Sequence, residues 1–482
     1  MSWKKILNIT GFLTFFLGLS MGFPLAVGIG FSDGSALPVM YAMIVTLVSG
    51  AGLIFFSRSS AEETIDKREA MVAVALCWLA AGFAGALPFY FGQVLPSFTD
   101  AVFESFSGFT TTGASVLSAV EAVAPGYLLW RSFIQWLGGM GIIVLSLAIL
   151  PLLGVGGMQL YIAEVPSPVP DKLQPRVRET AKTLWKVYIL FSLCELLLLQ
   201  ACGLNLFDAL CHTFTTMPTG GFSTRNLSIA AYESVYVDGV IILFMLFAGI
   251  NFSLHYQMLR GKTLAFWKDT ECRFFLLLVA VLIALVSWDV FGSIYETFGS
   301  ALRYSAFQVV SIITTTGFAT ADYEVWPALS QLILFICMFI GASAGSTGGG
   351  MKCVRILLGI KYCYKELFSL IHPKAVSHVK LAGKTIPEDV MRSIMGFLCL
   401  YVLLFVVCSM LLAAMGVDAV TSVGAVAASL GNIGPGFGEV GPLDNFSSIP
   451  LAGKWVLAWC MLLGRLEIYT IIILLVPEFW KK

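Results

Sequence analysis

Long apolar stretches constrain this chain more than any other feature of its sequence. A helix needs about 20 predominantly apolar residues to cross the hydrocarbon core of a bilayer. Ten segments have that length and composition: 6–30, 37–57, 70–94, 128–152, 184–204, 236–258, 273–294, 328–351, 394–416 and 453–477. The chain of 482 residues is 58% hydrophobic and only 12% charged, which excludes a soluble globular protein and a disordered one. The sequence therefore predicts an all-α polytopic membrane protein.

The distribution of lysine and arginine predicts the orientation of these segments. Basic residues concentrate in cytoplasmic loops. If the N-terminus with Lys4 and Lys5 is cytoplasmic, the alternate loops and the C-terminal tail together carry 24 of the 29 basic residues. We therefore expect a multi-pass protein with both termini in the cytoplasm. The formal net charge is zero, so we expect membrane lipid around the chain and no nucleic-acid partner.

Four shorter apolar segments, near 98–112, 206–218, 300–316 and 418–433, each end in a glycine-rich loop on the outer side. The aligned glycines are Gly113, Gly220, Gly317 and Gly434, which are 107, 97 and 117 residues apart. A period near 100 residues indicates four copies of one unit: helix, half-helix with loop, helix. The predicted division is 1–68 for two extra N-terminal transmembrane helices, then 69–165, 166–262, 263–360 and 361–482 for repeats 1 to 4.

The four loops have the composition of an ion path. Irregular backbone at membrane depth is tolerated only where it lines a cavity or is buried in protein. Glycine adopts positive φ without steric cost, so we expect positive φ at Gly113 and Gly317. Carbonyls aimed to one side can replace the hydration shell of a potassium ion. Asp100, Asp208 and Asp418 stand where each could cap a half-helix. The competing interpretation is a set of helix-packing motifs of small residues.

The loops TTTGA, MPTGGFS, TTTGFAT and GNIGPGFG resemble the filter loops of the Trk/Ktr/HKT potassium transporters. The two N-terminal helices and the tract GASAGSTGGGMK at 341–352 resemble the bacterial TrkH/TrkG branch of that family. The resemblance implies four pseudo-symmetric repeats around one pore, a homodimer in the bacterial cell inner membrane, and a separate cytosolic nucleotide-binding ring protein as regulator. It also implies potassium contacts from Thr111, Thr112, Gly113, Pro218, Thr219, Gly220, Thr315, Thr316, Gly317, Asn432, Ile433 and Gly434.

A second glycine-rich tract interrupts the eighth apolar stretch. Five glycines between 341 and 350 would cost a helix about 5 kcal/mol relative to alanine, so we expect a non-helical segment there. The resemblance implies an intramembrane gate that includes Gly345, Gly348, Gly349 and Gly350. The alternative is a close helix-packing face.

One basic residue, Arg465, lies in the middle of the last apolar stretch. An intramembrane charge is costly and is functional by default. The resemblance places Arg465 in the pore below the filter. The alternative is a salt bridge to an intramembrane acid such as Glu195.

We therefore expect potassium-selective uptake that is channel-like and gated by a cytosolic partner. The alternative is a secondary symporter that couples potassium to protons or sodium. We expect no enzyme activity, because the sequence contains no catalytic constellation. Potassium is the expected cargo, and we expect no organic cofactor in this chain.

Overall fold

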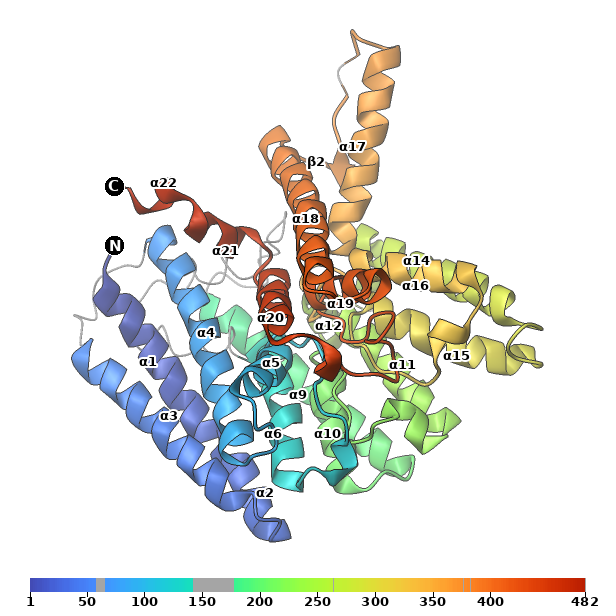
Figure 1. Ribbon diagram of the computed structural model, residues 1–482. Helices are drawn as coiled ribbons and strands as arrows, with labels where there is room; N and C mark the ends of the chain where they lie inside the picture. Colours follow the sequence, from blue (N-terminus) through green and yellow to red (C-terminus); the bar gives the residue numbers. More distant parts are fainter. Residues whose placement is uncertain (58–65, 142–176, 263, 376, 382, 482) are drawn as a thin grey trace.

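The computed structural model describes residues 1–57, 66–141, 177–262, 264–375, 377–381 and 383–481. Helices make up most of these residues and are joined by loops, as Figure 1 shows. The named strands of the described part, β1 (Lys380–Leu381) and β2 (Lys384–Thr385), form one short antiparallel hairpin. The predicted all-α fold is confirmed.

The N-terminal part is a layer of helices that packs against the first repeat. It consists of α1 (Trp3–Ser20), α2 (Gly22–Phe31) and α3 (Ala36–Phe56), and α1 packs against both α3 and α4 (Lys67–Phe91). The backbones of α1 and α3 lie so close that a Cβ on Gly50 would stand 2.5 Å from the backbone nitrogen of Phe15. Small residues permit this close approach between helices in a membrane, where dispersion rather than burial drives packing.

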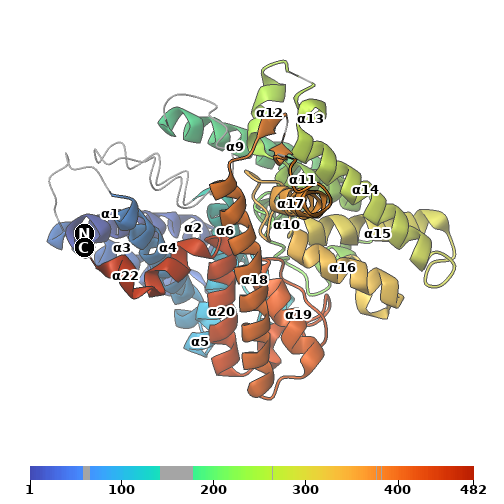
Figure 2. The same cartoon turned by 90° about the horizontal axis from the view of Figure 1, so that it is seen from above.

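The order of elements then recurs four times: a long helix, a short buried helix, an extended loop with a 3₁₀ turn, and a second helix. Figure 2 shows these groups in successive sectors around a common centre. The groups comprise α4, α5 (Phe98–Phe109), η1 (Val120–Ala122) and α6 (Pro125–Trp136); α9 (Val177–Ala201), α10 (Leu206–Thr216), η4 (Ser228–Tyr232) and α11 (Val235–Gly249); α14 (Thr270–Val290), α15 (Phe298–Ile313), η5 (Tyr323–Val325) and α16 (Ala328–Ile340); and α18 (Glu388–Ala414), α19 (Ala419–Leu430), η6 (Phe446–Ser448) and α20 (Leu451–Arg465).

The second helix of each group is not the straight span that hydropathy predicts. α11 ends at Gly249 and α12 (Phe252–Leu259) continues at an angle of 102°. α16 ends at Ile340, and the chain becomes helical again only in α17 (Cys353–Ile371). α20 and the following α21 (Tyr469–Ile472) with η7 (Ile473–Leu475) meet at 111°. The predicted spans 236–258, 328–351 and 453–477 are therefore wrong as continuous helices.

The first group shows a related distortion. A π-helical turn, η2 (Leu137–Gly141), follows α6 directly. The rest of the predicted span 128–152 lies outside the described residues, as does the boundary at 165. In the described part, six helices are long and apolar enough to cross a membrane, or eight if each bent pair counts as one span.

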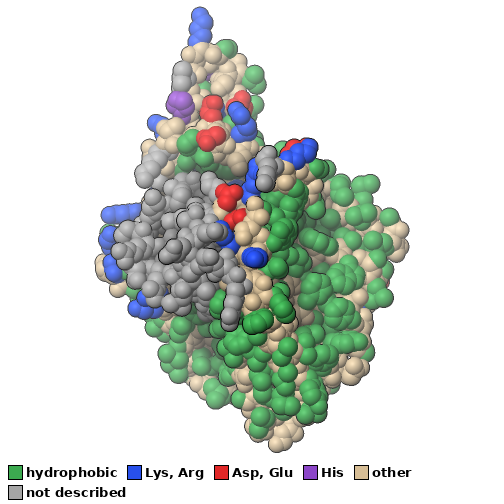
Figure 3. All heavy atoms as spheres, turned by 90° about the vertical axis from the view of Figure 1, so that its left-hand side faces the viewer, with side chains coloured by type: hydrophobic (Ala, Val, Ile, Leu, Met, Phe, Trp, Pro, Cys, Tyr) green, Lys and Arg blue, Asp and Glu red, His purple; other side chains and the backbone are tan. Residues whose placement is uncertain are grey.

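The chain ends and the charged surface gather at one end of the molecule. Figure 1 shows both termini on the side from which α17 projects. The rings of Trp3 and Trp480 stack with centroids 6.3 Å apart, and Trp480 ends the last helix, α22 (Pro477–Trp480). Figure 3 shows hydrophobic side chains over much of the face below and charged side chains on the projecting end. The predicted boundary at residue 360 falls within α17.

The hairpin and a short helix complete the described chain. The hairpin lies between α17 and α18 and joins the two helices. α13 (Ala265–Lys268) lies between α12 and α14 in the chain.

Candidate functional site

The four extended loops share one backbone conformation. Each starts with a non-glycine residue in the left-handed region and reaches a positive-φ glycine two residues later. The first positions are Thr111 (54°), Thr219 (58°), Thr315 (60°) and Asn432 (54°), and the glycines are Gly113 (84°), Gly221 (74°), Gly317 (79°) and Gly434 (102°). The positive φ expected at Gly113 and Gly317 is confirmed.

The second loop is aligned one residue away from its predicted register. Gly221, not Gly220, has the conformation of Gly113. The backbone hydrogen bonds agree, because the Gly220 N–H donates to the Thr215 carbonyl at 2.8 Å as the Thr112 N–H donates to the Ser107 carbonyl at 2.9 Å. The adjacent pair of glycines made the alignment ambiguous in the sequence, and the geometry gives spacings of 108, 96 and 117 residues for the four glycines.

The left-handed conformation of three threonines is not evident from the sequence. A β-branched residue at positive φ is a conformational outlier that costs about 1–3 kcal/mol and persists only where its surroundings enforce it. Such strain repeated at three equivalent threonines, Thr111, Thr219 and Thr315, is a feature of a functional site. No local sequence signal marks it, because threonine ordinarily avoids this region.

The four loops close into a ring. A Cβ on Gly113 would overlap the carbonyl oxygen of Gly220, one on Gly221 that of Thr316, and one on Gly317 that of Ile433. A Cβ on Gly434 would lie 2.8 Å from the carbonyl oxygen of Thr112 in the first loop. Each glycine therefore packs against the next loop in the order 1–2–3–4–1, and each is required by a close approach as well as by φ.

Loops 1 and 3 are held by hydrogen bonds of their own hydroxyl groups, and we call such a stabilising contact a brace. The Thr110 hydroxyl donates to the Phe106 carbonyl at 2.7 Å and lies 2.8 Å from the Thr112 hydroxyl. Since the Thr110 proton is used, Thr112 donates to Thr110. Loop 3 repeats the pattern, with Thr314 donating to the Val310 carbonyl at 2.7 Å and lying 2.8 Å from the hydroxyl of Thr316.

Loops 2 and 4 lack the threonine pair and are held by amide side chains. In loop 2, Gln135 of α6 donates to the Gly220 carbonyl at 2.6 Å and accepts from the Phe222 N–H at 3.2 Å. In loop 4, the amide nitrogen of Asn432 donates to the Thr112 hydroxyl at 3.0 Å and to the Met461 carbonyl at 2.8 Å.

A buried ion pair supports the same region from outside the ring. The Arg131 Nε lies 2.6 Å from the Glu104 carboxylate, and both side chains are almost fully buried. Arg131 also donates to the Ser223 carbonyl at 2.8 Å, and its guanidinium lies 3.6 Å from the centroid of the Phe222 ring. This pair therefore joins α5 and α6 to the exit of loop 2.

The predicted caps of the short helices are correct at one position of three. Asp418 caps α19, because its carboxylate accepts from the N–H groups of Val420 at 2.9 Å and Thr421 at 3.0 Å. Asp208 lies in the first turn of α10, where Asn205 is the cap. Asp100 lies in the first turn of α5 and accepts from Lys454 at 2.7 Å. Asp100 thereby joins α5 to α20, and Asp208 accepts from the Thr224 hydroxyl at 2.7 Å and from Arg225 at 3.2 Å in the loop after α10.

The glycine-rich tract packs against the ring. The chain from Gly341 to Lys352 is non-helical, as predicted. The Gly349 N–H donates to the Thr315 hydroxyl at 2.7 Å. The Thr347 hydroxyl donates to the Met217 carbonyl at 3.0 Å, just before loop 2. A Cβ on Gly348 would lie 2.9 Å from the carbonyl oxygen of Thr314, so the tract contacts the residues at which loops 2 and 3 begin.

The same tract satisfies the broken helix α11. The Ser343 N–H donates to the Gly249 carbonyl at 3.0 Å, and the Phe252 N–H donates to the Gly345 carbonyl at 3.1 Å. Backbone groups freed by a helix break must find partners at membrane depth. The two breaks therefore stabilise each other.

Arg465 is the last residue of α20 and binds backbone. Its guanidinium donates to the carbonyls of Thr347 at 2.9 Å, Gly138 at 2.7 Å and Gly139 at 2.8 Å. The alternative salt bridge to Glu195 is wrong, since neither carboxyl oxygen of Glu195 has a hydrogen-bond partner. Glu467 instead pairs with Arg355 of α17. Arg465 therefore ties the glycine-rich tract to the helix that follows loop 1.

The comparisons with known proteins agree with this geometry. The family model TrkH, described as a cation transport protein, matches residues 36–482. The chain belongs to the TrkH family. It is 42% identical over 486 residues to the Trk system potassium uptake protein TrkH of Halomonas elongata, and 41% identical over 488 residues to that of Escherichia coli (strain K12). Each of these matches covers 100% of both proteins.

A solved member of the TrkH family has the same fold. The crystal structure of the potassium transporter TrkH from Vibrio parahaemolyticus matches with a TM-score of 0.90 at 38% identity, covering 100% of both chains. The expected family resemblance is confirmed. The predicted site residues of the four loops lie together in the ring. In loop 2, the three residues equivalent to Thr111, Thr112 and Gly113 are Thr219, Gly220 and Gly221, so Pro218 lies one residue before them. Gly345, Gly348, Gly349, Gly350 and Arg465 lie in or against the adjoining tract.

Proposed function

We propose that this chain takes up potassium across the bacterial inner membrane through a channel-like path between the four loops. The closed ring of loops is the observation that carries the proposal, because each positive-φ glycine packs against a carbonyl of the next loop. Carbonyls gathered in this way can replace the hydration shell of a potassium ion. The names of the relatives, which are potassium uptake proteins, support the same cargo.

The selectivity filter is formed by the backbone of the aligned loop residues. The C-terminal ends of α5, α10, α15 and α19 lead directly into the loops, and the negative ends of helix dipoles favour a cation. The Gly220 carbonyl that binds Gln135 retains a second lone pair for an ion. The proposed ion contacts are Thr111, Thr112 and Gly113; Thr219, Gly220 and Gly221; Thr315, Thr316 and Gly317; and Asn432, Ile433 and Gly434.

Serine substitutions at the filter glycines test the proposal. Gly113→Ser and Gly317→Ser add a Cβ that overlaps the neighbouring loop at positive φ. We expect the uptake of potassium relative to sodium to fall at least tenfold in potassium-starved cells. Gly239→Ser is the control, because a Cβ at this glycine of α11 meets no atom within 4 Å. Unchanged discrimination in both filter variants would remove these glycines from the filter.

The tract 341–350 is proposed as the gate of this path. It contacts loops 2 and 3 and continues into α17, which projects toward the end that carries both termini. Arg465 anchors it at Thr347. Deletion of residues 345–350 should leave potassium flux in liposomes high without a regulatory partner, while selectivity persists. A shortened chain that folds and conducts no faster than the intact chain would favour a packing role for the glycines.

The projecting end is proposed as the surface for protein partners, a second copy of the chain and a cytosolic nucleotide-binding ring. α17 exposes large apolar side chains at Ile360, Tyr364, Leu367 and Leu370, each more than half exposed. Exposed apolar side chains gathered on one helix are typical of an interaction site. Cross-linking between cysteines placed at Leu367 in membranes would detect a homodimer through this helix.

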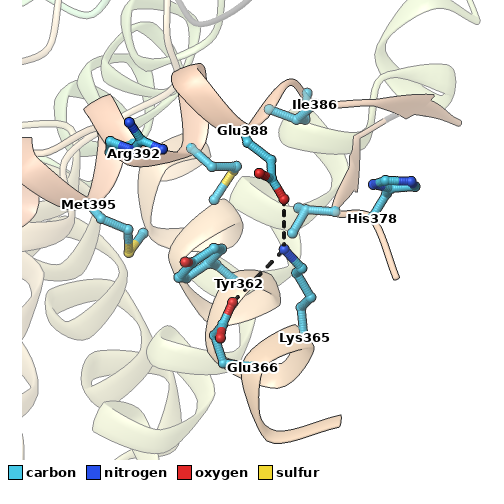
Figure 4. Close-up of a pocket in the computed structure, with 10 residues that line it drawn as sticks. Tyr362, Lys365, Glu366, His378, Ile386, Glu388, Arg392 and Met395 are labelled. Atoms are coloured by element: carbon cyan, nitrogen blue, oxygen red, sulfur yellow. Dashed lines mark hydrogen bonds and ion pairs between the residues drawn. The ribbon is translucent and has the colours of Figure 1, made fainter. Parts of the chain in front are cut away.

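A pocket at the base of this surface, lined by both charged and apolar side chains, favours a charged partner segment. It encloses about 320 Å³ between α17, the hairpin and α18. Figure 4 shows Lys365 directed between Glu366 and Glu388, at 3.9 and 3.5 Å. Lys365→Ala should weaken the response of potassium flux to the added ring protein and leave flux without it unchanged. An undiminished response would exclude this pocket from the partner interface.

One observation favours the alternative of ion-coupled symport. Within the described residues, Glu195 of α9 is fully buried and neither carboxyl oxygen has a hydrogen-bond partner. Intramembrane carboxyls of this kind serve proton relays in transporters, so Glu195 could carry a proton. Proton movement that accompanies potassium in liposomes and disappears in Glu195→Gln would establish coupling, and proton-free potassium flux would establish a channel.

A further inference from the structure

We propose that Gln135 and Asn432 are positioning residues that set the discrimination between potassium and sodium. The inference rests on the proposed filter function of the four loops. It concerns the two loops that have no threonine pair, and it assigns to two side-chain amides the bracing that loops 1 and 3 receive from their own hydroxyls.

Loop 2 cannot brace itself because Pro218 and Gly220 occupy the positions of the paired threonines. Proline and glycine carry no hydroxyl. Gln135 instead grips the loop on both sides of Gly221, donating to the Gly220 carbonyl at 2.6 Å and accepting from the Phe222 N–H at 3.2 Å. A Cβ on Gly220 would overlap this amide, so the glycine makes room for it.

The contact with Gly220 reaches the ring directly. The Gly220 carbonyl is the atom against which Gly113 of loop 1 packs. Gln135 is fully buried and lies on α6, which follows loop 1. The amide therefore fixes the position of a proposed ion-contacting carbonyl at the seam between loops 1 and 2.

Loop 4 has Gly431 and Ile433 at the paired positions and depends on Asn432. The orientation of the Asn432 side-chain amide is determined, because the Met461 carbonyl can only accept a hydrogen bond and must therefore face the amide nitrogen. The second amide proton then goes to the Thr112 hydroxyl. Asparagine also suits the left-handed φ of 54° better than threonine does.

The bond to Thr112 extends the brace of loop 1 into loop 4. Asn432 donates to Thr112, Thr112 donates to Thr110, and Thr110 donates to the Phe106 carbonyl at the end of α5. A directed chain of hydrogen bonds thus crosses the seam between the first and fourth loops. Loss of its first donor would free loop 4 from loop 1 and change the spacing of their carbonyls.

The test measures the potassium-to-sodium flux ratio in liposomes together with the melting temperature. Gln135→Met keeps the approximate shape and removes both bonds, and Asn432→Gly keeps the left-handed backbone and removes the amide. Each variant loses two hydrogen bonds that hold its loop, so each should lower the ratio by roughly three- to tenfold. Gln135→Asn, one methylene shorter, should lower it as well and guards against a Met variant that fails to fold.

Matched controls separate positioning from general stability. Gln308 of α15 is equally buried, but it donates to the Ala321 carbonyl at 3.2 Å, beyond the loop. Asn226 accepts from the Val120 N–H at 2.9 Å and so joins the first and second groups of helices outside the ring. Gln308→Met and Asn226→Gly should change the melting temperature without changing the ratio by more than about twofold.

A double-mutant cycle gives the second readout. Thr112→Val removes the acceptor of Asn432, so its effect on the ratio and that of Asn432→Gly should be non-additive. Unchanged ratios in Gln135→Met and Asn432→Gly, with a lowered ratio in Gly113→Ser, would overturn the positioning role and leave the filter intact. An unchanged ratio in Gly113→Ser as well would overturn the filter itself.

Discussion

Loops 1 and 3 differ from loops 2 and 4 in where their braces come from. Loops 1 and 3 read TTTG, and their first and third hydroxyls bond to each other and back to the preceding helix. Loop 2 depends on Gln135, which is 85 residues from the carbonyl it binds, and Asn432 reaches 320 residues to Thr112. One backbone conformation is thus stabilised in two ways, locally in two loops and by tertiary contacts in the other two.

This difference explains why the sequences of the loops diverge while their backbones agree. A hydroxyl pair requires a hydroxyl side chain, here threonine, at two positions, but an external amide allows proline, glycine or isoleucine there. The glycine at the end of each loop has no such substitute, because both its φ and its contact with the next loop exclude a side chain. The following predictions test the contrast, beginning with the largest expected effect.

Arg131→Ala should damage loop 2 most. The substitution leaves the fully buried Glu104 carboxyl without its cationic partner, and it removes the hydrogen bond to the Ser223 carbonyl. Breaking a buried pair costs about 3–5 kcal/mol, which thermal unfolding of the purified protein would measure. Arg303→Ala is the control, because its pair with Asp238 at 2.7 Å is partly exposed and should be worth about 1 kcal/mol or less. Equal losses would contradict the special role of the Glu104 pair.

Arg465→Ala should act on the tract rather than on the loops. Loss of charge-assisted bonds to three carbonyls should cost about 2–3 kcal/mol. Because Thr347 then loses its anchor, potassium flux should rise while the potassium-to-sodium ratio stays the same. A lower melting temperature without a gain in flux would assign Arg465 a structural role only.

Thr112→Val and Thr316→Val are equivalent changes in the two self-braced loops. Both remove the hydroxyl pair, but only Thr112 also accepts from Asn432. We expect a loss of stability of about 2 kcal/mol for Thr112→Val and about 1 kcal/mol for Thr316→Val. Denaturation curves and flux ratios measured side by side would show the order, and a larger effect at Thr316 would contradict the bridge between loops 1 and 4.

Asp418→Ala should have the smallest effect, below about 1 kcal/mol, since it removes an exposed helix cap. Hydrogen bonds from the Thr421 hydroxyl and the backbone N–H groups of Thr421 and Val420 lower the pKa of Asp418 from 3.8. A lowered pKa means that the charged cap contributes above about pH 4 and is lost as the pH falls through the folded pKa. Asparagine at position 418 can still cap the helix but does not titrate, so the melting temperature of Asp418→Asn should lack this acid dependence. The same dependence in Asp418→Asn and in the unmodified protein would exclude Asp418 as its source.

Several features of this protein follow from the sequence alone. Apolar length and composition require membrane helices, because the bilayer leaves few alternatives. The repeated glycine-rich loops indicate four equivalent units, and five glycines between 341 and 350 exclude a regular helix there. These are local properties, determined by side-chain polarity and by backbone freedom within a few residues.

Other features were decided only by tertiary structure. The break at Gly249 could not be predicted, because the tract near Ser343 satisfies the freed backbone groups. The register of loop 2 was ambiguous between Gly220 and Gly221 until its neighbours fixed φ. The left-handed threonines and the Asn432 bridge depend on contacts between distant residues, which no local preference encodes. Hydropathy and spacing therefore locate the four loops in the sequence, whereas packing between the repeats determines the geometry of the ring.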